Sequence, residues 1–161
     1  MSAHEASDPA AGWSSPQLSA QGIDPRGPRF SAGVTSVVLT VTLLLGDTTP
    51  ALLLLGLVAA TFVTGVVSGP AGSLTGTVYR RWVAPLLPTT RDREDPGPPR
   101  FAQAVGLTIS AAGIALGLIG VPGAVPIAAA VALVASFLNA AFGFCLGCEL
   151  YLLGRRFLDR G

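Results

Sequence analysis

The sequence is poor in charged residues, and the charge is missing from whole stretches of the chain. Only 12% of its 161 residues are Asp, Glu, Lys or Arg, whereas soluble domains carry about 25%. Two stretches, Thr48–Tyr79 and Phe101–Cys148, contain no charge at all. Uncharged runs of this length leave no polar face for water, which excludes an ordinary soluble domain. A bilayer core takes about 20 apolar residues per helix, so an integral membrane protein is predicted.

Histidine and cysteine are also scarce, which limits the possible chemistry. The single histidine, His4, lies in a polar stretch, residues 1–22, that we expect to be a disordered cytoplasmic tail. The only cysteines, Cys145 and Cys148, are too few for a disulfide framework. The chain contains no phosphate-binding loop, zinc-protease motif or Ser-His-Asp set. We therefore expect no cofactor and no nucleic-acid partner.

Turn residues divide the apolar stretches into four predicted transmembrane helices. The predicted fold is all-α, a four-helix transmembrane domain over residues 23–157 with spans at about 30–45, 51–67, 101–119 and 126–144. Thr49 is predicted to cap the second span ahead of Pro50. Pro122-Gly123 suits a type II turn between the last two spans. Residues 70–100 then form a middle segment, and residues 158–161 form a C-terminal tail.

Arginine predicts the orientation, because the chain contains no lysine and all ten basic residues are arginine. None of them lies in the short connection between the first and second spans or in that between the third and fourth spans, where Asp47 is the one charged residue. Arginine-rich segments stay in the cytoplasm. Both termini and the middle segment are thus predicted to be cytoplasmic, in the plasma (inner) membrane.

A short motif precedes the first and third spans. "DPRGPRF" runs from Asp24 to Phe30 and "DPGPPRF" from Asp95 to Phe101, with five of seven positions identical. The chain is therefore interpreted as two repeated helical hairpins, related by an approximate two-fold axis along the membrane normal. The alternative is that both stretches have similar residues because each starts a membrane helix, without a duplication. A second match lies at the exits, the segments that follow the second and fourth spans. If Arg80-Arg81 is aligned with Arg155-Arg156, Ser73 is paired with Cys148.

These entry motifs and the segment "FLNAAFGFCLGCELYLLGRR" resemble a bacterial membrane family, domain of unknown function 4395. The resemblance covers about Ile23–Arg156 and implies a small polytopic membrane protein of an actinobacterial type. It also implies thioredoxin-like proteins and sulfurtransferases as possible partners. The middle segment "GSLTGTVYRRWVAPLLP" resembles that of the family but is less basic than expected.

Cys145 and Cys148 form a Cys-x-x-Cys pair, and three interpretations stay open. The thiols could be structural, they could exchange electrons or sulfur, or they could bind a metal if a second subunit completed the ligand set. A break at Gly143 or Gly147 would start an interfacial helix near Cys145, whereas a continuous helix would disfavour a thiolate. Glu149 opposes ionisation of Cys148, so Cys145 is the better candidate nucleophile.

Three polar residues within or beside the spans are candidates for a shared cavity with the thiols: Asn139, Ser136 and Gln103. The alternative is that the amides link helices by hydrogen bonds. Gly113 and Gly117 are interpreted as helix-packing positions. Tyr79, Trp82, Tyr151 and Phe157 are expected in an interfacial aromatic belt.

The sequence therefore predicts a membrane-bound thiol redox or sulfur-handling partner acting through Cys145 and Cys148 at the cytoplasmic face. Two alternatives are a scaffold or assembly subunit with structural cysteines and a small transporter of a sulfur compound. The sequence does not predict an oligomeric state.

Overall fold

The computed structural model describes residues 22–89, 92 and 94–159, and these residues are almost entirely helical. Residues 1–21 of the predicted tail, and residues 160–161, lie outside the described part. The helices are α1 (Arg26–Leu45), α2 (Thr49–Gly72), α3 (Leu74–Val78), the π-helical η1 (Tyr79–Val83), the 3₁₀ turn η2 (Ala84–Leu86), α4 (Gly97–Leu118), α5 (Ala124–Phe142) and α6 (Leu146–Leu158). The one β-type pairing in this part is an isolated antiparallel bridge between Ile23 and Glu94.

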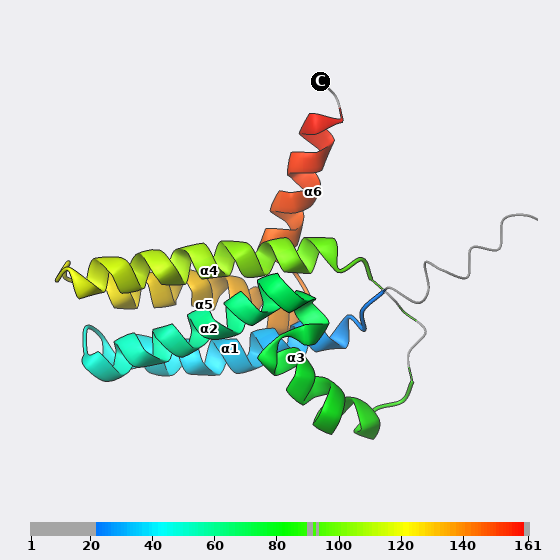
Figure 1. Cartoon of the computed structure of the whole chain (residues 1–161), viewed down its shortest axis with the longest axis horizontal. Helices are drawn as coiled ribbons and strands as arrows, with labels where there is room; N and C mark the ends of the chain where they lie inside the picture. The colour runs from blue at the N-terminus through cyan, green and yellow to red at the C-terminus, as the bar shows by residue number, and fades with distance from the viewer. Residues whose placement is uncertain (1–21, 90–91, 93, 160–161) are drawn as a thin grey trace, which may run out of the picture.

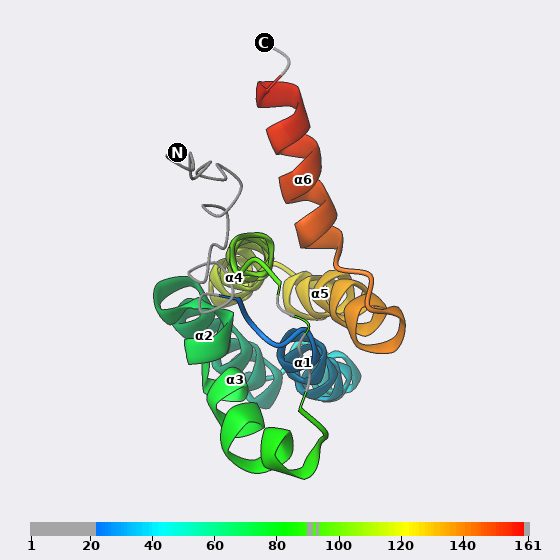
Figure 2. The same ribbon diagram turned by 90° about the vertical axis from the view of Figure 1, so that its right-hand side faces the viewer.

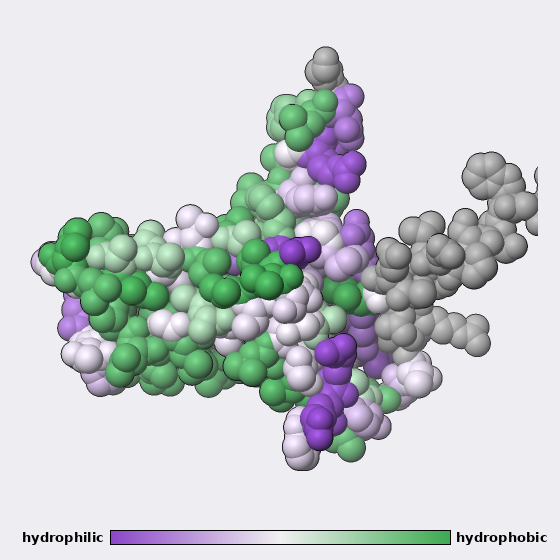
Figure 3. All heavy atoms as spheres, in the orientation of Figure 1, coloured by the Kyte–Doolittle hydropathy of each residue, from purple (hydrophilic) through white to green (hydrophobic). Residues whose placement is uncertain are grey.

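Four helices, α1, α2, α4 and α5, run side by side as an elongated bundle (Figure 1, Figure 2). Each is long and apolar enough to cross a membrane. The face of the bundle shown in Figure 3 is mostly hydrophobic, and Leu53 and Ile127 are 70% and 65% exposed. Apolar side chains pointing outward along the whole length are what lipid contact requires. The chain is an all-α, multi-pass membrane protein, as predicted.

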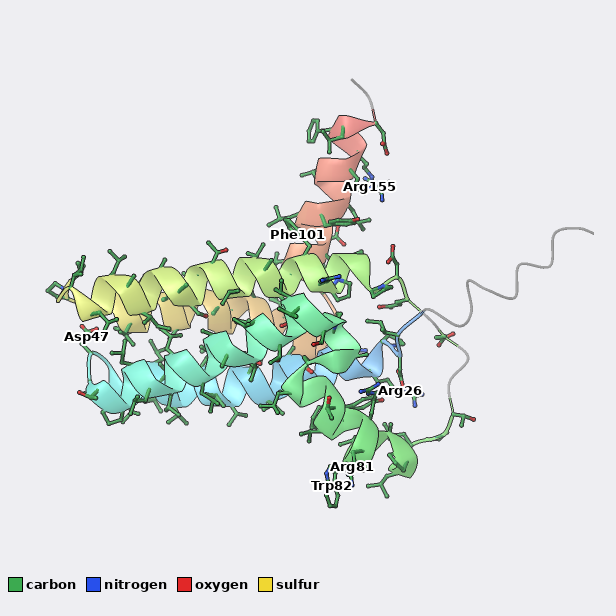
Figure 4. The ribbon with its side chains drawn as sticks, in the orientation of Figure 1. Arg26, Asp47, Arg81, Trp82, Phe101 and Arg155 are labelled. Carbon is green, nitrogen blue, oxygen red and sulfur yellow. The ribbon has the colours of Figure 1, made fainter. Side chains whose placement is uncertain are left out.

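The two ends of the bundle differ in charge. Arg26, Arg81 and Arg155 lie at the end from which α3 and α6 leave, and Asp47 lies at the other end (Figure 4). The Asp47 carboxylate accepts a hydrogen bond from the backbone N–H of Gly123 and so joins the two hairpin turns. Both hairpins therefore turn at the same end of the bundle, opposite the arginines.

Small residues allow the helices to pack closely. The buried core contains Leu39 of α1, residues of α2 and a row of alanines on α5 that includes Ala128 and Ala129. A Cβ atom at Gly113 of α4 would overlap Ala128, and one at Gly117 would lie 2.7 Å from Val125. The interpretation of these two glycines as packing positions is confirmed.

The helix contacts follow one scheme in both halves of the chain. The helix α1 packs mainly on α5 and then on α2, and the helix α4 packs mainly on α2 and then on α5. Outside the bundle, α3 contacts α1 and α6 contacts α4. Equivalent pairings of this kind are what two hairpins around a two-fold axis would give. The axis itself stays a prediction.

Three local predictions concern a turn, a helix cap and a helix break. Gly123 adopts φ 78° and ψ −3°, the conformation of the third residue of a type II turn, so that prediction is confirmed. The predicted cap at Thr49 is wrong by one residue, because the side chain of Thr48 accepts the hydrogen bond from the Ala51 N–H. The predicted break after the second span is a kink at Gly69, where φ is 77°.

Candidate functional site

The fourth span ends at Gly143, at the end of the bundle that carries the arginines. Gly143 has φ 70° and ψ 13°, and its N–H donates to the Asn139 carbonyl at 3.0 Å. This left-handed conformation is one that glycine adopts at little cost and that commonly ends helices. Of the two glycines considered from the sequence, Gly143 therefore breaks the helix. Gly147 packs against Ala102 of α4 instead.

The break places Cys145 at the N-terminus of a new helix. Cys145 is the N-cap residue of α6, and its sulfur accepts a hydrogen bond from the Cys148 N–H at 3.4 Å. A helix N-terminus presents free N–H groups and a partial positive charge, both of which favour a thiolate. The helix α6 then leaves the bundle at a steep angle (Figure 1).

Both cysteines are free thiols of intermediate burial, and they differ in acidity. A hydrogen bond from the Cys148 thiol, helped by the N–H groups of Cys148 and Gly147, lowers the pKa of Cys145 to about 7, although burial and Glu149 oppose the shift. The same hydrogen bond, burial and the nearby negative charges of Cys145, Glu94 and Glu149 raise the pKa of Cys148 well above its usual range. The two shifts have opposite directions, so ionisation of the pair is favoured at Cys145 and disfavoured at Cys148.

The thiols line a cavity of about 710 Å³ at the arginine-bearing end of the bundle. Its walls come from α1, α2, α4, α5 and the start of α6. All five candidate site residues of the sequence lie in this lining: Cys145, Cys148, Asn139, Ser136 and Gln103. The structure therefore brings the thiols and the three polar residues to one cavity.

Two amide side chains of the cavity lining are unpaired. Within the described part of the chain, the side chains of Gln103 and Asn139 have no hydrogen-bond partner. The interpretation of these amides as links between helices is therefore not supported. Gln103 instead lies against Gly65 of α2, where there is no side chain to displace it.

Sequence reasoning missed two charged residues of this cavity, Arg29 and Glu94. The guanidinium of Arg29 approaches Gly143, with its central carbon 3.2 Å from the position that a Cβ would take. Glu94 is held near the thiols by its backbone bridge to Ile23. The contacts that bring them to the cavity join distant parts of the sequence, so no local pattern indicates them.

The described residues contain no group of three or more His, Cys, Asp or Glu that could hold a metal ion. Two thiols are half of a tetrahedral zinc site. A metal here would need ligands from a second subunit, and that alternative stays a hypothesis.

The end of the first hairpin has a related structure. Ser73 is the N-cap residue of α3, and its hydroxyl accepts from the Gly76 N–H at 3.0 Å. Six residues after each cap, Tyr79 and Tyr151 contact Phe30 and Phe101, with ring centroids 5.7 Å apart in both pairs. The caps and the tyrosines therefore match at an offset of 72, whereas the arginine pairs match at an offset of 75. Cys145 corresponds to Ser73.

These contacts also revise the aromatic belt. Tyr79 is buried, and its hydroxyl donates to Asp24 at 3.0 Å. Trp82 and Phe157 are exposed, as a belt requires. Tyr79 is therefore a packing residue and not a belt residue.

The fold and the site define a class: a small multi-pass α-helical membrane protein with a thiol pair at a helix N-terminus beside a polar-lined cavity. A family model described as Domain of unknown function (DUF4395) matches residues 23–156. The chain belongs to this family, as the sequence motifs suggested. Neither the comparison with curated proteins nor that with solved structures gives a match.

Proposed function

We propose that the protein is a membrane-bound thiol-disulfide exchange partner in which Cys145 is the nucleophile and Cys148 the resolving thiol. The observation that carries the proposal is the position of Cys145 as N-cap of α6, hydrogen-bonded to Cys148. A thiolate at a helix N-terminus with a protonated thiol three residues later is an arrangement suited to exchange.

The exchange proceeds in two balanced steps. The Cys145 thiolate attacks one sulfur of a partner disulfide, forms an S–S bond to it and releases the other partner sulfur as a thiolate. Cys148 then gives its proton to the released thiolate, and the Cys148 thiolate attacks the Cys145 sulfur. This attack breaks the mixed disulfide and releases the partner's second sulfur as a thiolate. The products are a Cys145–Cys148 disulfide and a reduced partner, and the reverse sequence oxidises a partner dithiol.

The same nucleophile also suits sulfur handling. Attack of the Cys145 thiolate on the outer sulfur of a persulfide would leave a persulfide on Cys145 and release a thiolate. A thioredoxin-like protein and a sulfurtransferase are the partner classes that these two reactions require. Steric access is available to both, because neither thiol is fully buried.

A trapping experiment tests the proposal. In a Cys148→Ser variant, the mixed disulfide between Cys145 and a thioredoxin variant with one active-site cysteine, supplied as a disulfide with a small thiol, should accumulate, because neither protein then has a resolving thiol. A Cys145→Ser variant should trap much less. If both native thiols resist alkylation until the protein is unfolded, they are packing residues and the scaffold alternative replaces this proposal.

Transport of a sulfur compound is the third possibility, and no observation favours it over exchange. The described spans carry no acidic side chain that would couple transport to protons. Uptake of a sulfur compound into proteoliposomes, at the same rate in the native protein and in Cys145→Ser, would support a transporter instead.

The orientation is part of the proposal. The arginines at the thiol end of the bundle support a cytoplasmic position for that end and for both termini, in the plasma membrane. Reporter fusions at Gly161 and near Asp92 should therefore report the cytoplasm, and a fusion at Thr48 should report the outside. An external C-terminus would contradict this orientation.

A further inference from the structure

We propose that the cavity beside Cys145 and Cys148 binds a lipid-soluble quinone, which accepts the two electrons released when the thiol pair becomes a disulfide. The inference rests on the proposed exchange function and names its electron acceptor. Oxidation of the pair forms one S–S bond and releases two electrons and two protons. A quinone takes up both electrons and both protons to become a quinol, so the reaction balances.

The position of the cavity suits a ligand that arrives through the membrane. The thiols line the cavity, and residues of α5 that belong to a membrane-spanning helix line it as well. Among these, Val131 is 50% and Val134 58% exposed. Exposed apolar side chains on a spanning helix face lipid, so the same part of α5 borders both the cavity and the bilayer.

The size and lining of the cavity suit an aromatic head group. Its volume of about 710 Å³ lies within the roughly 300–1,000 Å³ typical of small-molecule sites. Ile109, Phe62 and Leu150 provide apolar walls, and a few polar groups lie among them. Such sites generally combine mostly apolar walls with a few polar groups that orient the ligand.

The unpaired amides supply the orienting groups. Gln103 on α4 and Asn139 on α5 each carry an NH₂ group that donates hydrogen bonds, and neither has a partner among the described residues. The carbonyl oxygens of a quinone are acceptors, so amide donors on different helices complement its head. Arg29 adds a cationic donor to the lining. A lipid acyl chain, the simplest other occupant, would use none of these groups.

The test follows quinone reduction in proteoliposomes without oxygen. Decylubiquinone is the probe, because its ring is fully substituted and thiols do not add to it readily. Reduced thioredoxin is the electron donor, and the quinone absorbance reports the reaction. We expect one quinol per thioredoxin oxidised, and a loss of the protein-dependent rate in Cys145→Ser and in Cys148→Ser.

The cavity is tested with Asn139→Ala and Gln103→Ala. Each should raise the quinone concentration that gives the half-maximal rate by fivefold or more, while the alkylation rate of Cys145 without quinone stays unchanged. Ser110→Ala is the matched control, because Ser110 lies on α4 outside the cavity lining. It should leave both quantities unchanged.

The outcomes separate the two proposals. If thioredoxin exchanges with the pair but quinone is reduced no faster than with Cys145→Ser, the quinone inference is overturned and the exchange function stands. If the quinone concentration that gives the half-maximal rate is the same in Asn139→Ala, Gln103→Ala and the native protein, the quinone does not bind in this cavity. A further control asks whether a decyl compound without carbonyl groups slows the alkylation of Cys145 as much as decylubiquinone does. That result would show a non-specific apolar site and would also overturn the inference. Failure of thioredoxin exchange itself contradicts the proposed function.

Discussion

The junction between α2 and α3 and the junction between α5 and α6 have the same construction but different caps. Each follows a positive-φ glycine, Gly69 or Gly143, and each begins its short helix with a capping side chain. The cap is the hydroxyl of Ser73 in the first junction and the thiol of Cys145 in the second. A cap of this kind therefore forms with either a hydroxyl or a thiol.

The two junctions also differ in the space around them. Ser73 is fully buried, whereas Cys145 is partly exposed and faces the cavity. At the position three residues after the cap, Gly76 has no room for a side chain, but Cys148 occupies the equivalent position of α6. A reactive thiol pair fits only the second junction, which is why we place the function there.

The largest effect is expected from Cys145→Ser, which replaces the thiol cap of α6 by a hydroxyl cap like that of α3. Serine is a good N-cap, so thermal unfolding in detergent should change little. Thiol exchange with thioredoxin should fall to the rate without protein, because the nucleophile is gone. Exchange that persists would show that Cys148 is the nucleophile.

The matched control adds a thiol at the first junction. Ser73→Cys in a Cys145→Ser, Cys148→Ser background places one thiol at an N-cap that is buried. We expect alkylation of this thiol to be far slower than that of native Cys145. An equal rate would mean that access does not distinguish the two junctions.

Gly76→Ala should destabilise the first junction. The added Cβ would meet the backbone oxygens of Pro70 and Ala71, and the Ser73 hydroxyl at 2.9 Å. Overpacking of this kind costs about 1–3 kcal/mol, which thermal unfolding in detergent can measure. Gly33→Ala is the control, because no atom lies within 4 Å of the added Cβ. If both variants unfold alike, the steric difference between the junctions is not real.

Cys148→Ala should make Cys145 less reactive near neutral pH. Cys148 donates the hydrogen bond that contributes most to lowering the pKa of Cys145 to about 7. Its loss raises that pKa, so the thiolate fraction at pH 7 falls, by about tenfold for each further pKa unit once the pKa exceeds the pH. The pH dependence of alkylation measures this shift.

Cys148→Ser is the comparison variant for that shift, because its hydroxyl can still donate to the Cys145 sulfur. Its alkylation midpoint should lie between those of the native protein and of Cys148→Ala. A native midpoint at the ordinary value near 8.5 would contradict an acidic Cys145.

A smaller effect is expected from Arg100→Ala. The carbonyl of Val66 lacks its helical donor, because that position is Pro70, which has no N–H. Arg100 donates to Val66 at 2.6 Å and to Val67 at 3.3 Å in its place. Its loss should cost about 1 kcal/mol of stability. Arg29→Ala should cost less, because Arg29 approaches Gly143 without a hydrogen bond to a described residue.

The sequence was sufficient for the spans and for the polar residues of the cavity. Charge-free runs identify membrane helices whatever the details of packing, and an Asn139 or Gln103 in such a run is conspicuous. It was not sufficient to choose between Gly143 and Gly147 as the helix break, because both glycines permit one. Contacts with α4 decide between them, since Gly147 packs on Ala102.

Arg29 and Glu94 could not be placed in the cavity from the sequence. Both lie next to turns rich in proline, where no periodicity indicates a face. Their positions follow from long-range contacts: the Ile23–Glu94 bridge and the packing of the α1 start near Gly143. The alignment of Ser73 with Cys145 could not be predicted for a similar reason, because it rests on the ring contacts of Tyr79 and Tyr151.

The most direct test of the account is the redox state of the two thiols in the native protein. Membranes would be equilibrated with mixtures of reduced and oxidised glutathione, and free thiols would then be alkylated and counted by mass spectrometry. We predict that both thiols are lost together as a Cys145–Cys148 disulfide and are recovered together on addition of reduced thioredoxin. Two thiols that stay reduced in every mixture, or that react only after unfolding, would contradict a redox role for the pair.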